Sequence, residues 1–297
     1  MRFGTLRLAT GKDVPALFRP DGPVDLLEEA ARRGLPPPPR AGRDFVAAWT
    51  ARDPALQDLV HQARQSPRAL VPEGSFRFRP PVPDPRLVIA VGLNYRSHCR
   101  EQDREVPSSP LFFAKIPTCL SGHRDPIPAW PLTGQLDYEA ELAVVIGRPG
   151  RDIPLDRAMD HVAGYTILND VTARDLQRQE RQWTRAKGLD GFGPCGPWWV
   201  AREEVPDPQR LGIRAWVNGE LRQDSSTEEM VFPVALLVSR LSQGISLQAG
   251  DILSTGTPAG VGVFRTPPTF LAPGDDVAIE VDGIGRLENR VVDPAGL

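Results

Sequence analysis

The chain has 297 residues, of which 40% are hydrophobic and 25% charged, and its formal net charge is −3. These values predict a globular protein with one large domain, or with one large and one small domain. No apolar stretch approaches the roughly 20 residues needed to cross a bilayer, which argues against a membrane protein. The near-neutral net charge gives no sign of the strongly basic surface that nucleic-acid binding requires.

Residues 1–80 are predicted to form a small N-terminal α/β domain. A hairpin comes first, then a helix over 25–33 that ends at Gly34 and is followed by four consecutive prolines. A second helical stretch is expected over 43–65. Clustered prolines between Pro72 and Pro85 mark the crossing into a second domain, predicted over 85–297.

The second domain has the pattern of a β-rich α+β fold. Strands are predicted over 87–92, 142–147, 164–169, 213–218, 251–256, 277–281 and 287–292, and helices near 95–105, 172–187 and 233–243. There is no βαβ rhythm and no GxGxxG after a strand, which argues against a dinucleotide-binding fold.

Three carboxylates carry the main chemical signal. Glu139 and Glu141 project to the same side of a predicted strand, as does Asp137, and Asp170 closes a second β-like run. An acidic set of this kind inside a sheet stays ionised only if a cation binds, and an all-oxygen set suits Mg²⁺ or Mn²⁺. The spacing alone fits the solvated face of an edge strand equally well.

Lysine is rare in this chain: of 35 basic residues only three are lysine, namely Lys12, Lys115 and Lys187. The lysine ammonium is a compact point charge, whereas the arginine guanidinium is larger and planar, so the two are not interchangeable. Lys115 and Lys187 are therefore candidates for a site that needs an ammonium group. Lys12 lies in a Gly-Lys-Asp turn, where the presence of lysine rather than arginine is explained by chance.

His98 and Glu101 follow a predicted strand and are three residues apart, so on a helix they share a face. A carboxylate beside an imidazole raises its basicity and suits a general base that activates water. A solvated helix face has the same spacing. Cys99 points away from His98 on a helix and is discounted as a nucleophile.

The chain has three cysteines, Cys99, Cys119 and Cys195. This odd number favours a cytoplasmic location.

Taken together, these segments resemble the fumarylacetoacetate hydrolase family over about residues 85–293. The motifs, in family order, are Val91-Gly92-Leu93-Asn94-Tyr95 with His98 and Glu101, Leu111-Phe112-Phe113-Ala114-Lys115, Leu136-Asp137-Tyr138-Glu139-Ala140-Glu141-Leu142, Asn169-Asp170, Ala173-Arg174-Asp175-Leu176-Gln177, Lys187, Asn218-Gly219-Glu220-Leu221-Arg222-Gln223 and Ser254-Thr255-Gly256-Thr257-Pro258-Ala259-Gly260-Val261-Gly262.

The resemblance implies a mixed β-sandwich roll, a homodimer and a Mg²⁺ or Mn²⁺ ion held by Glu139, Glu141 and Asp170. It makes His98 and Glu101 the dyad that activates water, with Lys187 as a further catalytic residue. It places Lys115, Gln177 and Thr257 at the substrate. Gly188 and Gly191 stand where the family often has Ser and Thr, which puts specificity in doubt because both changes suggest a wider substrate end.

The implied substrate is a small oxo acid that chelates the cation. The expected reaction is cleavage of a C–C bond in a 2-oxo or 1,3-dicarbonyl acid through an enolate, either as acylpyruvate or fumarylpyruvate hydrolysis or as oxaloacetate decarboxylation. The alternatives within the family are a 2-hydroxyhepta-2,4-diene-1,7-dioate isomerase and a 2-oxo-3-deoxy sugar acid dehydratase. A metal-binding protein without catalysis is a further alternative, disfavoured because a dyad and a retained lysine would then be superfluous.

Overall fold

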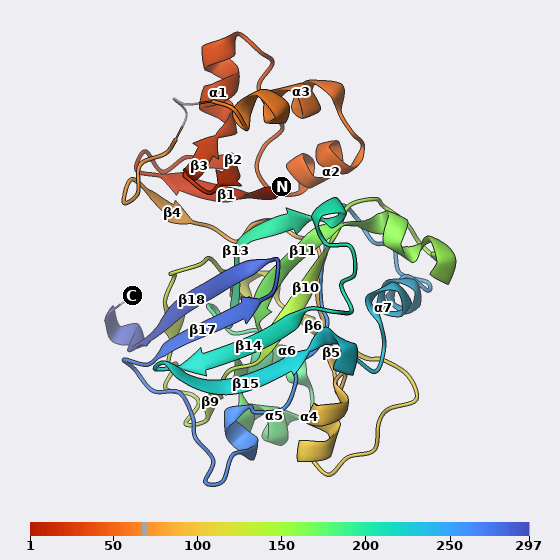
Figure 1. Cartoon of the computed structure of the whole chain (residues 1–297). Coiled ribbons are helices and arrows are strands. Elements are labelled where there is room, and N and C mark those ends of the chain that lie inside the picture. Colours follow the sequence, from red (N-terminus) through yellow and green to blue (C-terminus); the bar gives the residue numbers. More distant parts are fainter. Residues whose placement is uncertain (67–69, 297) are drawn as a thin grey trace.

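The computed structural model describes residues 1–66 and 70–296 and forms a β-rich α+β roll with a small N-terminal unit (Figure 1). Within these residues no helix is long and apolar enough to cross a membrane. The N-terminal unit contains β1 (Arg2–Leu8), β2 (Asp13–Arg19), β3 (Gly22–Asp25), α1 (Leu26–Arg33), α2 (Arg43–Thr50), α3 (Pro54–Ala63) and β4 (Phe76–Phe78). The roll contains β5 (Val88–Gly92), α4 (Arg96–Glu101), β6 (Leu111–Lys115), β7 (Leu120–Ser121), β8 (Ile127–Pro128), β9 (Leu136–Asp137), β10 (Ala140–Ile146), β11 (Val162–Asn169), β12 (Thr172–Ala173), α5 (Arg174–Glu180), α6 (Trp183–Lys187), β13 (Gly193–Ala201), β14 (Gly212–Val217), β15 (Glu220–Ser226), α7 (Val234–Leu241), β16 (Ile252–Ser254), β17 (Asp276–Val281) and β18 (Gly285–Val292).

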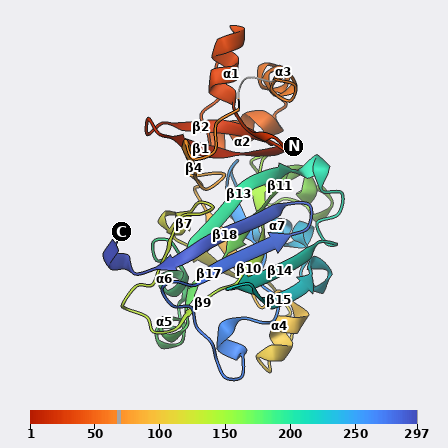
Figure 2. The same cartoon turned by 60° about the vertical axis from the view of Figure 1, so that its left-hand side comes forward.

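The roll is built around two large facing sheets, with a separate two-stranded sheet of β9 and β12. The larger sheet has the order β3-β2-β1-β13-β11-β10-β16-β5-β6, and the second sheet the order β15-β14-β17-β18-β8. Strands β14, β17 and β18 lie over β10, β11 and β13 (Figure 2). The largest apolar core fills the space between the sheets and includes Leu142, Val144, Ile167, Ile279 and Leu287. Strand β10 is central, paired with β11 on one side and β16 on the other.

Two predicted helices are each split in the structure. The stretch over 43–65 forms α2 and α3, because Asp53 caps α3 by accepting the Leu56 N–H at 2.9 Å and Pro54 occupies the first turn. The stretch over 172–187 forms α5 and α6, separated by Arg181 in the left-handed region at φ 60°. Helix α1 ends at Gly34, with φ 67°, as predicted.

The N-terminal unit is joined to the roll through the large sheet. Strand β1 pairs with β13, with Arg2 opposite Val200 and Phe3 opposite Trp199. The Phe3 ring also packs against Trp49 of α2, with ring centroids 4.6 Å apart, and against Trp199 at 5.0 Å. The two parts of the chain therefore share both a sheet and an apolar core.

Candidate active site

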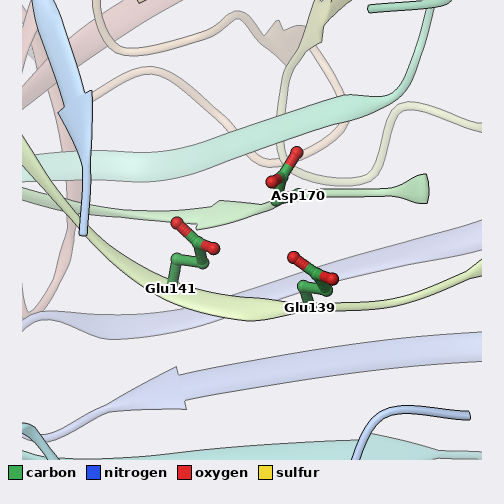
Figure 3. A group of neighbouring side chains, drawn as sticks. All are labelled: Glu139, Glu141 and Asp170. Atoms are coloured by element: carbon green, nitrogen blue, oxygen red, sulfur yellow. The ribbon is translucent and has the colours of Figure 1, made fainter. Parts of the chain in front are cut away.

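Glu139, Glu141 and Asp170 lie together at the end of the central strands. One carboxylate oxygen from each residue lies within 4.8 Å of the others, and all three side chains are buried. Figure 3 shows Glu139 and Glu141 projecting from the same ribbon toward Asp170. The register of β10 and β11 accounts for this, because Ala140 is paired with Asn169, and Asp170 follows directly. The Asp170 N–H donates to the Glu139 carbonyl at 3.0 Å.

Asp137 does not join this cluster, although strict alternation would place it on the same side. The chain leaves the strand at Tyr138 and Glu139, between β9 and β10. The Asp137 carboxylate instead accepts hydrogen bonds from the backbone N–H groups of Gly262 and Val263, at 2.8 and 3.0 Å, and from Arg174 Nε at 2.8 Å.

Two of the three lysines approach the acidic cluster. Lys187 Nζ donates to Glu139 at 2.8 Å, to Asp170 at 2.7 Å and to the Thr172 hydroxyl at 2.8 Å. Lys115 Nζ donates to the other oxygen of Asp170 at 2.7 Å and to two backbone carbonyls. Both ammonium groups are buried, so each depends on these contacts to offset the loss of water.

Arg174 is a site residue that the sequence reasoning missed. Its guanidinium, on α5, lies between Asp137 and Glu139, with Nη2 2.7 Å from Glu139 Oε1. Nη1 donates to the Gln177 amide oxygen at 3.1 Å. The available signal was its place in the motif Ala173-Arg174-Asp175-Leu176-Gln177, which follows Asp170 and puts Arg174 one helical turn before Gln177.

Charge is unevenly compensated within the cluster. Burial raises the pKa of Glu139, but the positive charges of Lys187 and Arg174 outweigh this and lower it to about 2. Glu141 forms no ion pair among the described residues, and burial together with the negative charges of Asp170 and Glu139 holds its pKa well above the usual range. A buried all-oxygen set with one uncompensated carboxylate fits a hard divalent cation.

Two carboxylates of the cluster, Glu139 and Glu141, line a cleft of about 470 Å³. His98 is on the cleft wall, and its Nδ1 lies 2.5 Å from Glu101 Oε1. The lining consists of Val91, Gly92, Leu93, His98, Gln102, Arg104, Phe113, Glu139, Glu141, Arg174, Gln177, Arg178, Trp183, Lys187, Thr257, Val263 and Phe264. The structure thus brings His98, Lys187, Gln177 and Thr257 to one cavity with two of the carboxylates.

Lys115 lies behind the cluster, because β6 directs its side chain inward and its ammonium is fully buried against Asp170. Its prediction as a substrate contact is therefore not supported by its position. Gly188 and Gly191 do not widen the cleft, which neither of them lines. A Cβ at Gly188 would lie 2.3 Å from the Thr184 carbonyl, and Gly191 has φ +80° with Pro128 adjacent, so both glycines relieve crowding.

The remaining histidines lie outside the cleft. His123 is buried; its Nδ1 accepts the Glu288 N–H at 3.0 Å and its ring packs edge-on against Phe78. His161 Nδ1 is 2.9 Å from the Arg148 carbonyl. His61 is exposed on α3.

Comparison with known proteins gives a consistent result. Residues 87–292 match the family described as fumarylacetoacetate (FAA) hydrolase C-terminal. The oxaloacetate tautomerase YisK of Bacillus subtilis is 46% identical over 219 residues, covering 72% of this chain and 73% of YisK. The mitochondrial oxaloacetate tautomerase FAHD2B of Bos taurus is 44% identical over 240 residues, covering 80% of this chain and 76% of that protein.

Solved structures of similar proteins superpose on nearly the whole chain. A fumarylacetoacetate hydrolase from Exiguobacterium antarcticum superposes with a TM-score of 0.81 at 35% identity, covering 99% of both chains. A 2-hydroxyhepta-2,4-diene-1,7-dioate isomerase from Mycobacterium marinum gives a TM-score of 0.74 at 31% identity, again covering 99% of both.

The family match over residues 87–292 includes the strands of the roll and all three carboxylates of the buried acidic triad. The chain belongs to the fumarylacetoacetate hydrolase family and is an enzyme of that family.

Proposed function

We propose that this enzyme interconverts the enol and keto forms of a 2-oxo dicarboxylate such as oxaloacetate, with Mg²⁺ or Mn²⁺ held by Glu139, Glu141 and Asp170. The buried acidic triad beneath the cleft carries the proposal. The relatives named oxaloacetate tautomerases support the substrate. The bound cation would act as a Lewis acid that polarises the 2-oxo carbonyl and acidifies the neighbouring C–H bond.

The protein's own groups would then move the proton. His98 is the candidate base, because Glu101 engages Nδ1 and leaves Nε2 as the ring nitrogen available to accept a proton and to return it. Lys187 adds a fixed positive charge where negative charge develops on the substrate oxygen. Thr257 and Gln177 line the same cavity and would orient the acid.

Lys115 and Arg174 would act through other residues. Lys115 holds Asp170 from behind, and Arg174 holds Glu139 from the side. Groups that orient ligating carboxylates in this way typically change metal affinity or activity by 10–100-fold when they are replaced.

The decisive experiment is an enol-oxaloacetate assay that follows loss of the enol absorbance while pyruvate formation is measured in parallel. Metal-dependent enol loss without pyruvate supports a tautomerase, whereas stoichiometric pyruvate supports a decarboxylase. Absence of both reactions with Mg²⁺ and with Mn²⁺ would contradict the proposal.

A second candidate is hydrolysis of an acylpyruvate, which is favoured by the contact between His98 and Glu101 beside the cleft. The same dyad can activate water for attack on a distal carbonyl. Metal-dependent cleavage of an acylpyruvate to pyruvate and a carboxylic acid would support it. Turnover of oxaloacetate alone would exclude it.

A further inference from the structure

Arg104 and Arg178 line the candidate active-site cleft without ion-pair partners. Arg104 follows α4 and Arg178 is on α5. In the described part of the chain neither guanidinium forms an ion pair with a carboxylate. The other basic side chains of the lining, Arg174 and Lys187, are each bound to carboxylates of the site. The cleft thus has two basic side chains paired with the acidic cluster and two guanidinium groups that form no ion pair among the described residues.

The position of Arg104 is fixed by its backbone. Helix α4 ends at Glu101, and Asp103, two residues further on, is in the left-handed region at φ 51°, a conformation that aspartate tolerates. The Arg104 N–H then donates back to the Cys99 carbonyl at 3.0 Å, and the Asp103 N–H to the Arg100 carbonyl at 3.1 Å. This chain reversal holds Arg104 at the cleft and leaves its side chain free to bind. Among the described residues, the Arg178 side chain is hydrogen-bonded only to the uncharged amide of Gln135.

Part of the wall of the same cleft is apolar. The rings of Phe113 and Trp183 meet edge to face with centroids 5.1 Å apart. Trp183 packs directly over Gly92, where an added Cβ would lie 2.5 Å from the indole. The cleft volume of about 470 Å³ falls in the range of pockets that enclose ligands much larger than oxaloacetate.

We propose that Arg104 and Arg178 form a subsite for the distal carboxylate of a 2-oxo dicarboxylate longer than oxaloacetate. The planar guanidinium matches a carboxylate in two-point hydrogen bonding. The carbon chain between the two acid groups would lie against Phe113 and Trp183. This inference rests on the proposed function, because the 2-oxo end is assigned to the acidic triad.

The test is exchange of the C3 hydrogens into D₂O, followed by proton NMR with Mg²⁺ present. The substrates are 2-oxoglutarate, 2-oxoadipate and 2-oxopimelate, each compared with the 2-oxo monocarboxylate of equal length. Wild-type enzyme is compared with the double variant Arg104→Gln/Arg178→Gln. The control is Arg100→Gln, on α4 four residues before Arg104, with its side chain 69% exposed and outside the cleft lining. Calorimetric titration gives the Kd of each acid independently of turnover, and circular dichroism verifies folding.

The double variant should raise KM and Kd for the longer dicarboxylates by roughly tenfold or more, as expected when charged hydrogen bonds are lost. The values for monocarboxylates should stay unchanged, as should all values for Arg100→Gln. An equal increase for both classes of acid, or no increase for the dicarboxylates, would overturn the subsite. Selective loss of dicarboxylate binding without exchange of any acid by the wild type would support the subsite and contradict the proposed reaction.

Discussion

The Glu101 carboxylate on α4 accepts a hydrogen bond of 2.9 Å from the backbone N–H of Gly260, in the loop that also carries Thr257. Its other oxygen contacts His98 at 2.5 Å. One side chain therefore fixes both the candidate base and a loop at the cleft. It can do so because an ionised carboxylate offers two acceptor oxygens.

Replacement of Glu101 by Gln should lower turnover and leave metal affinity unchanged. Glutamine can still accept the Gly260 N–H, but its NH2 group can only donate to His98 Nδ1, which puts the imidazole proton on Nε2 and removes the base. We expect turnover to fall by about 10²–10⁴, the usual contribution of a positioned general base. The Kd for Mn²⁺, measured by calorimetry, should be unchanged. If decarboxylation of oxaloacetate dominates, a substantial part of that activity should remain. Turnover of enol-oxaloacetate and acylpyruvates at the wild-type rate would rule out the dyad.

Lys187→Arg should inactivate the enzyme although arginine is the common basic residue of this chain. Lys187 Nζ makes three contacts of 2.7–2.8 Å in a buried position, and the bulkier planar guanidinium of arginine cannot reproduce that compact three-point geometry. We expect a loss of about 10²–10³ in kcat. The control is Lys12→Arg, which changes an exposed lysine of the N-terminal unit. Equal kcat in both variants would mean that lysine at 187 is incidental.

Removal of Glu141 should abolish metal binding without unfolding the protein. Its carboxylate accepts hydrogen bonds from the Gly256 N–H, at 2.9 Å, and from the Ser254 hydroxyl. Both donors bind the same oxygen, so Glu141→Gln preserves the size of the side chain and its amide oxygen can keep both bonds. We expect Mn²⁺ affinity to fall by more than the roughly 10–100-fold typical of residues that only support ligands. The readouts are calorimetry and Tm, and chelator should inactivate the wild type reversibly. Full activity in chelator would refute the metal site.

His123 should make the fold sensitive to mild acid. Burial and the neighbouring Arg124 lower the pKa of its imidazole to about 4, below the ordinary value near 6.5. Between these values the unfolded chain binds the proton and the folded chain does not, so the free energy of unfolding falls as pH decreases. The expected loss is about 2 kcal/mol from pH 7 to pH 5.

Urea unfolding of wild type, His123→Gln and His61→Gln at both pH values measures this contribution. The His123 variant should lose less stability on acidification by about the same 2 kcal/mol. His61 is exposed, so its variant should behave like wild type. Identical acid sensitivity in all three proteins would show that His123 is not responsible.

Local patterns were sufficient to locate the acidic cluster. Glu139 and Glu141 share a face because side chains alternate along a strand, and Asp170 closes the neighbouring strand. Arg174 was missed because its importance depends on Asp137, which reaches it only once β9 has paired with β12. That pairing is a tertiary contact with no signal at short range.

Strand β13 shows the same limit for the fold. Its residues Gly193, Pro194, Gly196 and Pro197 are typical of turns, yet pairing with β11 extends the segment as a strand. Lys115 was assigned to the substrate from its chemistry, whereas β6 directs it behind Asp170. The homodimer and the cytoplasmic location stay predictions.

The pairing of β1 with β13 also has a consequence during synthesis. Domains generally fold as units while the chain emerges from the ribosome, N-terminal parts first. The hairpin of β1 and β2 can form early, and β4 then pairs with β1 over Leu6–Leu8. Arg2 and Phe3 stay unpaired on that side until β13 has been synthesised, because their partners are Val200 and Trp199. Unpaired strand edges are templates for wrong strand pairing, so this short part of β1 stays exposed to mispairing for longest within the strand.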